Sequence, residues 1–178
     1  MQKNSYVLIT PARNEQDYIQ KTIESVVSQT ILPEKWVIVS DGSTDHTDEI
    51  VSHYAAKHDF IQFIRVSEHI QRNFWSKVHA FNAGYEQIKN TEYKFLGNLD
   101  ADVSFNSNYY ENVLLRFQTN PKLGIAGGII LELLNGQYVN QKLSLNSVAG
   151  AIQLFRRECY QDIGGYIPLT YGGVDSAA

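Results

Sequence analysis

The sequence is poor in cysteine, in long apolar runs and in charge of one sign, and each shortage excludes a class of protein. Its 178 residues include one cysteine, Cys159, so no disulfide can form within the chain, and we expect a cytoplasmic protein. The most apolar later stretch, residues 124–134, is too short for a membrane span and contains Glu132. The first residues lack the charged flank, apolar stretch and cleavage site of a secretory signal.

Charge of either sign is also sparse. Fifteen Lys and Arg stand against nineteen Asp and Glu, and the net charge of -4 is spread without a long basic run, so we expect no nucleic-acid partner. Neither a G-x-G-x-x-G fingerprint nor a P-loop is present, which argues against a dehydrogenase and a nucleoside triphosphatase. With 43% hydrophobic residues, the chain can bury the core of one compact domain.

Short apolar runs alternate along the chain with segments of helical periodicity. The apolar runs are rich in β-branched side chains, as buried strands are, and they lie at 6–10, 36–40, 60–66, 94–100 and 123–131. Helical patterns occupy about 16–29, 46–58, 75–90 and 107–119, and Asp45 is expected to cap the second. This alternation predicts an α/β fold with a central, mostly parallel sheet and helices on both faces.

The alternation stops after residue 131. The sequence then predicts a polar hairpin or loop at 134–147, a strand at 147–155 and a short helix at 156–164 that ends at two glycines. The final residues, YIPLTYGGVDSAA, resemble the approach to a further helix, so we expect the sequence to be a fragment of a longer chain.

Polar residues follow four of the predicted strands, where ligands of an open parallel sheet gather. They are TPARNE at 10–15, SDGSTD at 40–45, SEHIQRNFWSK at 67–77 and DAD at 100–102. In extended chain the two aspartates of DAD would face the same side, about 7 Å apart, and could share a cation. Their hard oxygen atoms suit Mg²⁺ or Mn²⁺. Alternatively, one aspartate caps the next helix and the other faces solvent.

The motifs after the first two strands also have structural explanations when each is taken alone. Gly42 and Ser43 are good turn residues, Pro11 ends a strand, and Glu15 suits the first turn of a helix. Asp41 fits this explanation worst, because a residue at the end of the strand would face the crevice. Its carboxylate could accept hydrogen bonds from a ribose or from the N–H of a base.

Taken together, the four pieces resemble a known family. P-x-x-N-E at 11–15, D-G-S-T-D at 41–45, K-x-x-A-x-N-x-G at 77–84 and D-x-D at 100–102 are similar in order and spacing to the family 2 glycosyltransferases of the GT-A fold. The resemblance covers essentially the whole chain. It implies one domain, residues 1–178, with a nucleotide-sugar donor half at about 1–103 and a partial, truncated acceptor half at about 104–178.

The resemblance implies an enzyme that moves a sugar, with inversion, from a nucleotide-diphosphate donor to an acceptor hydroxyl. By the same match, Thr10 and Pro11 line the nucleotide pocket with Glu15 nearby, Asp41 contacts the base and Asp100 the ribose. The implied donor is a UDP-sugar first, then a GDP- or TDP-sugar. The implied acceptor is a carbohydrate or a lipid-linked molecule in polysaccharide biosynthesis, with the enzyme in the cytoplasm or peripheral at the inner face of the membrane.

Four further roles follow from the resemblance. Asp102 is the expected ligand of a divalent metal, Mn²⁺ or Mg²⁺, Lys77 and Arg72 are expected near the donor phosphates, and Asp175 is the candidate catalytic base. The chain departs from the family at two places. Ser76 stands directly before the lysine, where glycine is common, and Val174 stands before the candidate base, where glutamate is common.

Three other readings remain open at this point. A non-catalytic module that binds nucleotide sugars would have the same donor motifs. A metal-dependent phosphatase with D-x-D would have it on the first strand, whereas here it follows the fourth. A nucleotidyltransferase would have a Gly-rich, basic loop in place of TPARNE.

Overall fold

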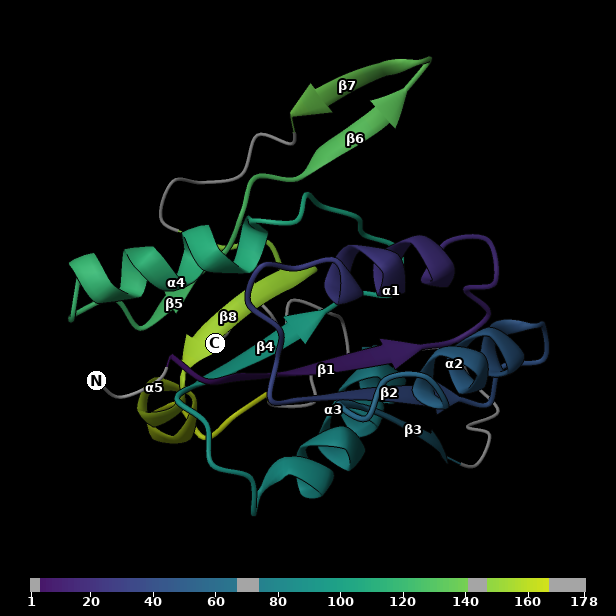
Figure 1. Ribbon diagram of the computed structural model, residues 1–178, viewed down its shortest axis with the longest axis horizontal. Coiled ribbons are helices and arrows are strands. Elements are labelled where there is room, and N and C mark those ends of the chain that lie inside the picture. Colours follow the sequence, from purple (N-terminus) through teal and green to yellow (C-terminus); the bar gives the residue numbers. More distant parts are fainter. Residues whose placement is uncertain (1–3, 67–73, 141–146, 167–178) are drawn as a thin grey trace.

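A six-stranded sheet forms the centre of the molecule in the computed structural model, which describes residues 4–66, 74–140 and 147–166 (Figure 1). Its strands run in the order β3-β2-β1-β4-β8-β5. Their bounds are β1 Tyr6–Ala12, β2 Lys35–Asp41, β3 Ile61–Val66, β4 Phe95–Leu99, β5 Ile125–Ala126 and β8 Ile152–Arg156.

Most of the sheet is parallel, which confirms the predicted α/β architecture. Strand β1 pairs in parallel with both β2 and β4, and β2 pairs in parallel with β3. Strand β8 is antiparallel to β4 and to β5. The chain therefore moves outward from β1 to β3 and then crosses back to β4, and a sheet of this kind binds ligands where the strand order reverses.

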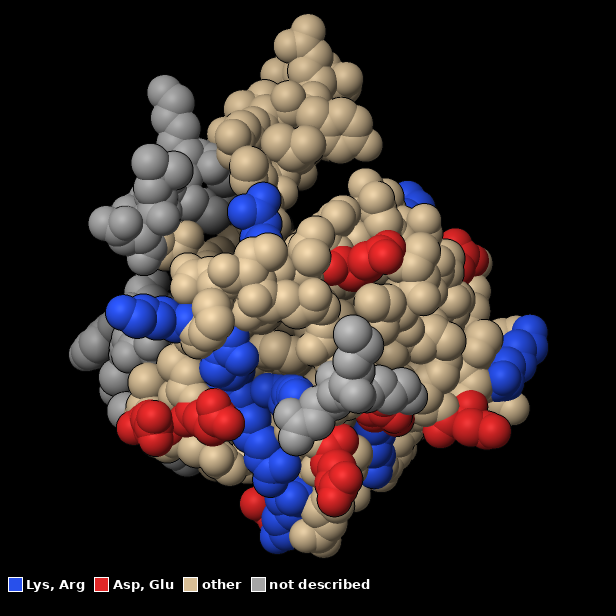
Figure 2. Space-filling model, turned by 60° about the vertical axis from the view of Figure 1, so that its left-hand side comes forward, with Lys and Arg blue, Asp and Glu red and all other residues tan. Residues whose placement is uncertain are grey.

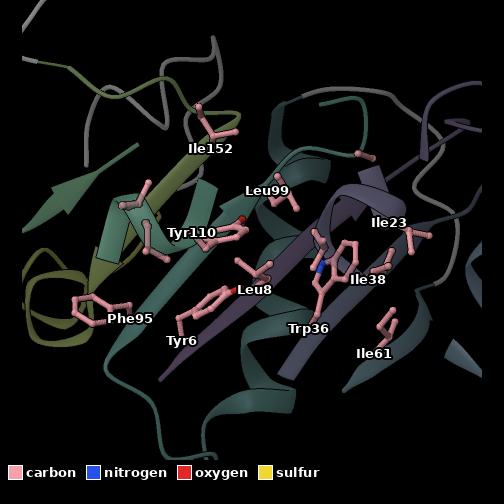
Figure 3. Packing of buried hydrophobic residues seen from close by; sticks show 14 of the residues in the cluster. Tyr6, Leu8, Ile23, Trp36, Ile38, Ile61, Phe95, Leu99, Tyr110 and Ile152 are labelled. Carbon is pink, nitrogen blue, oxygen red and sulfur yellow. The ribbon is translucent and has the colours of Figure 1, made fainter. Parts of the chain in front are cut away.

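Two hydrophobic clusters explain why the apolar runs of the strands are continuous. Tyr6 and Leu8 of β1 point into one cluster, whereas Val7 and Ile9 point into the other, so both faces of the strand are buried. Figure 3 shows the first cluster, in which Tyr6, Leu8, Trp36 and Leu99 project from one face of the sheet and Tyr110 of α4 stacks on Tyr6. This packing accounts for the accurate prediction of the central strands from sequence.

Helices cover both faces of the sheet, as predicted. The first cluster includes residues of α1 (Ile19–Val27), α2 (Thr47–Ala55) and α4 (Tyr109–Thr119). The second includes residues of α3 (Phe74–Ile88) and α5 (Arg157–Asp162). In the part of the chain that the structure describes, no helix has the length and apolar character that crossing a membrane requires.

The close packing of α3 on the sheet depends on a glycine. A Cβ atom added to Gly84 would lie 2.7 Å from Cγ2 of Ile9 and 3.0 Å from Cγ2 of Val39. Both neighbours are buried and β-branched, so they can yield little space. The last glycine of the K-x-x-A-x-N-x-G motif therefore permits the helix to approach the sheet, which places Lys77 at the other end of the helix above the strand ends.

The prediction of one strand at 123–131 was wrong. Only Ile125–Ala126 pair with β8, after which the chain leaves the sheet at Gly127 and Gly128 and enters a separate hairpin. The hairpin consists of β6 (Leu131–Leu134) and β7 (Gln137–Asn140), and it projects from the body of the domain (Figure 1). The apolar residues of the hairpin are exposed. The apolar pattern of a sequence cannot by itself distinguish exposed apolar residues from buried ones.

The surface carries charges of both signs. On the face seen in Figure 2, Lys and Arg side chains form a band with Asp and Glu on both sides of it, whereas the projecting hairpin shows neither. The exposed apolar side chains of that hairpin include Leu131, Leu133 and Tyr138.

Candidate functional site

A crevice of about 570 Å³ lies at the carboxyl ends of β1, β2 and β4 and at the start of α3. This is the place that the order of the strands predicts for a ligand. Its lining consists of Pro11, Ala12, Arg13, Glu15, Asp41, Ser76, Lys77, Ala80, Asp100, Ala101 and Asp102. Six predicted site residues therefore share one cavity: Pro11, Glu15, Asp41, Lys77, Asp100 and Asp102.

Hydrogen bonds join the first two motifs to each other. The side-chain oxygen of Asn14 accepts the amide of Thr44 at 2.8 Å, and the amide of Asn14 donates to the hydroxyl of Ser43 at 3.2 Å. Asn14 has a positive φ of 57°, a conformation that asparagine tolerates better than most residues. The two loops thus form one wall, and much of the P-x-x-N-E and D-G-S-T-D pattern serves to build it.

Asp45 adds two more bonds to this wall. Its Oδ2 accepts the amide of Gln16 at 3.1 Å and its Oδ1 accepts the amide of Thr47 at 3.0 Å. Burial alone raises the pKa of Asp45, but the hydrogen bonds from Thr47 and Gln16 outweigh it, and the net effect is a lowered pKa. The residue at the N-cap position of α2 is His46, so the prediction of Asp45 at that position was wrong by one residue. Asp45 precedes the N-cap, and its side chain still accepts the amide of Thr47, the first residue of the helix.

Asp41 is the most buried charged group of the crevice, with only 4% of its surface exposed. Its Oδ2 lies 3.4 Å from Nη1 of Arg13. Its Oδ1 is buried and accepts no hydrogen bond from any of the described residues. A buried carboxylate oxygen without a donor is costly, so a ligand that supplies an N–H or O–H at this point would gain a strong, charge-assisted hydrogen bond.

The DAD segment is a turn, not the extended chain assumed from sequence. Strand β4 ends at Leu99, and two contacts hold the turn that follows. The amide of Asp100 donates to the carbonyl of Ala151 at 2.8 Å, and the hydroxyl of Thr22 donates to the carbonyl of Ala101 at 2.8 Å. Ala101 is buried between the two aspartates, and both aspartates still line the crevice.

Lys77 reaches this turn from the first helical turn of α3. Its Nζ lies 2.6 Å from Oδ1 of Asp100, which makes a close ion pair. The side chains of Lys77 and Asp100 are 44% and 25% exposed, so solvent partly screens the pair.

Carboxylates outnumber cations in the crevice. Glu15, Asp41, Asp100 and Asp102 stand against Arg13 and Lys77, which leaves a formal charge of -2 on the lining residues. The described residues contain no group of three or more His, Cys, Asp and Glu side chains that could hold a metal. Two carboxylates at one turn still fit a hard divalent cation that takes its remaining ligands from water and from substrate phosphates.

One predicted site residue lies outside the crevice, and two others cannot be placed relative to it. Thr10 is fully buried in the core, where its Oγ1 accepts the indole N–H of Trp36 at 2.9 Å, so its side chain does not line the crevice. The candidate base Asp175 and the expected phosphate contact Arg72 fall outside the described residues.

Sequence reasoning missed Arg13 and Ser76, which both line the crevice. Arg13 sits inside the TPARNE segment, and its charge next to a predicted strand end was a usable signal. Ser76 lies in the polar segment SEHIQRNFWSK directly before Lys77, but its burial depends on the packing of α3 against the sheet, which the sequence does not show.

Comparison with known proteins now identifies the fold and the family. The pattern of glycosyl transferase family 2 matches residues 7–164, most of the chain. The chain belongs to this family. The family and the fold predicted from the motifs are thereby confirmed.

Two curated proteins are similar to this chain in sequence. Poly-beta-1,6-N-acetyl-D-glucosamine synthase of Staphylococcus epidermidis is 28% identical over 170 residues, which cover 85% of this chain and 39% of that protein. The synthase of the same name from Staphylococcus aureus is 26% identical over the same shares. The chain thus spans 39% of the length of these relatives.

Solved structures show the shared GT-A fold. The mannosyltransferase PcManGT of Pyrobaculum calidifontis, in complex with GDP-Man and Mn²⁺, has a TM-score of 0.69 at 21% identity over 97% of this chain and 49% of its own. A fragment of S. aureus TarS in complex with UDP has a TM-score of 0.69 at 20% identity, over 97% of this chain and 53% of its own. At identities of 20–21%, this structural similarity shows a shared fold and not a shared activity.

Proposed function

We propose that this domain transfers a sugar from a nucleotide-diphosphate sugar to an acceptor hydroxyl, with inversion at the anomeric carbon. One observation carries the proposal: Asp41 at the end of β2 and Asp100 at the end of β4 line the same crevice on either side of β1. Strands two places apart in a sheet are about 10 Å apart, a distance that one nucleoside can span. The family and its relatives support the same activity.

In this proposal the nucleoside lies between the two aspartates. Oδ1 of Asp41 accepts the N–H of a uracil, thymine or guanine base, because it is a buried acceptor to which no described residue donates a hydrogen bond. Asp100 accepts a ribose hydroxyl, and Pro11, Ala12 and Glu15 complete the wall behind it. A UDP-sugar is the first candidate, since neighbours of this fold were solved with UDP and UDP-GlcNAc, and a GDP-sugar is the second, since another was solved with GDP-Man.

The diphosphate lies beside the DAD turn and the start of α3. Asp102, with Asp100 next to it, would hold a divalent cation, Mn²⁺ or Mg²⁺, and PcManGT was solved with Mn²⁺. When bound, that cation stabilises the charge that accumulates on the leaving diphosphate. Lys77 contributes a positive charge to the same phosphates, and Arg72 is proposed to do so as well.

Asp175 is proposed as the base that removes the proton from the acceptor hydroxyl. The sugar then bonds to the acceptor oxygen on the face opposite the departing phosphate, which inverts the anomeric carbon. The names of the relatives favour a carbohydrate acceptor in polysaccharide assembly. We propose that the reaction takes place in the cytoplasm. If the acceptor is lipid-linked, the enzyme would act as a peripheral protein at the inner face of the membrane.

A ligand screen followed by one variant tests this function. We expect one of UDP-GlcNAc, GDP-mannose and TDP-glucose to raise the melting temperature in the presence of Mn²⁺. A CDP-sugar serves as the comparison and should give a smaller shift, because cytosine offers its amino group but no ring N–H. Asp175→Asn should keep the affinity for that donor and lose transfer to acceptor. No shift with any donor would contradict the proposal, and donor binding without transfer by the unaltered domain would favour the non-catalytic binding module.

A further inference from the structure

The ion pair between Lys77 and Asp100 occupies the part of the crevice in which a cation and a diphosphate would meet. Nζ of Lys77 lies 2.6 Å from Oδ1 of Asp100, and both residues line the same cavity as Asp102. The turn that carries both aspartates is fixed by the bonds of the Asp100 amide to Ala151 and of the Ala101 carbonyl to Thr22. The backbone that carries Asp100 is therefore held in place beside the ammonium of Lys77.

The position of Lys77 has two electrostatic consequences. A carboxylate with an ammonium at this distance presents less negative potential to a second cation, so the lysine opposes a metal that arrives alone. A diphosphate has the reverse effect, because its negative charge attracts the same ammonium away from Asp100. Lys77 is long and 44% exposed, so its head can shift between the two without rearrangement of the core.

We propose that Lys77 is the internal counter-cation of Asp100 and makes binding of the divalent cation depend on binding of the diphosphate. The inference rests on the proposed function, since it concerns the order in which the metal and the donor occupy that site. It assigns Lys77 a second role beyond attraction of the phosphates. The lysine disfavours a metal without a nucleotide and thereby couples the two ligands, and such coupling is reciprocal.

The test compares Mn²⁺ binding with and without UDP, measured from the electron paramagnetic resonance signal of free Mn²⁺. In Lys77→Met, Mn²⁺ alone should bind about three- to tenfold more tightly than in the unaltered protein, because a partly screened ion pair no longer competes. In the same variant, UDP in the presence of Mn²⁺ should bind at least about threefold more weakly. These opposite changes cannot come from loss of folding, which weakens both.

Two matched variants serve as controls. Lys89→Met breaks an ion pair with Glu86 on the exposed surface of the same part of the chain and should change neither affinity. Lys77→Arg keeps the charge and should bind Mn²⁺ alone as the unaltered protein does.

The contrary results separate the inference from the proposed function. Equal or weaker binding of Mn²⁺ alone by Lys77→Met, or no measurable binding by either protein, overturns the role of Lys77 while leaving Mn²⁺-dependent UDP binding intact. Absence of Mn²⁺-dependent nucleotide binding in every protein overturns the proposed function, and the inference falls with it.

Discussion

The amide of Glu15 donates a 2.7 Å hydrogen bond to the hydroxyl of Thr47, across two loops that are 32 residues apart in sequence. With the bonds around Asn14 and Asp45, this contact makes the loops after β1 and β2 one rigid wall of the crevice. The wall ends at Asp41 and Arg13, the pair most deeply placed in the site.

The first prediction concerns Asn14, whose φ of 57° and side-chain bond to Thr44 both depend on the residue type. Asn14→Ala should lower the free energy of unfolding by about 2 kcal/mol, because alanine resists this backbone conformation and the bond is lost. Asn14→Gly loses only the bond and should cost about 1 kcal/mol. Urea denaturation measures both, and equal losses would show that backbone strain at this position is unimportant.

The second prediction concerns pH. The pKa of Asp45 is lower in the folded protein than in the unfolded chain, so its ionisation adds stability above the unfolded value of about 3.9 and loses it as pH falls through the folded value. Asp45→Asn should therefore be less stable than the unaltered protein at neutral pH. The difference should shrink as pH falls below about 4. A difference independent of pH between 7 and 3, in thermal melts, would contradict the role of the charge.

The third prediction tests whether Thr10 serves the stability of the core or the binding of the nucleotide. Trp36→Phe leaves the buried hydroxyl of Thr10 without its donor and should cost about 1–3 kcal/mol of stability. Thr10→Val should cost a similar amount, and the double variant should cost less than the sum, as expected for coupled partners. Nucleotide affinity should be unchanged in Thr10→Val. A selective loss of nucleotide binding there would show that Thr10 contacts the ligand after all.

The fourth prediction tests the approach of α3 to the sheet. Gly84→Ala places a Cβ 2.7 Å from Ile9 and should destabilise by about 1–2 kcal/mol, even though alanine favours helices. Because α3 carries Lys77 and Ser76, the same variant should weaken nucleotide binding. Glu86→Ala, at an exposed position of the helix, is the control and should be close to neutral. A more stable Gly84→Ala protein would mean that the helix can move outward without strain.

Much of the fold could be predicted from the sequence, because buried parallel strands have a distinctive pattern. Strands β1 and β2 are buried on both faces, so the continuous apolar runs at 6–10 and 36–40 locate them to within two residues. The run at 123–131 has the same composition but divides between β5 and an exposed hairpin. Periodicity reports apolar side chains and cannot report what covers them.

The site was predictable where it depends on strand ends and not where it depends on side-chain partners. Asp41 and Asp100 follow strands and lie in the crevice as expected. Thr10 also lies toward the end of a strand, yet its hydroxyl accepts a hydrogen bond from the indole N–H of Trp36. This contact between two strands is not visible in the sequence. The pairing of Lys77 with Asp100 was equally hidden, because it depends on how closely α3 approaches β4.

The fifth prediction addresses the central claim, that the crevice is a metal-assisted site for a nucleotide diphosphate. Isothermal titration calorimetry of UDP, or of whichever nucleotide the donor screen selects, measures this directly with and without Mn²⁺. We predict that binding by the unaltered protein requires Mn²⁺ and that Asp102→Asn weakens it at least about tenfold, while the melting temperature changes little because Asp102 is exposed. Binding of equal strength without Mn²⁺, unchanged in Asp102→Asn, would contradict the account.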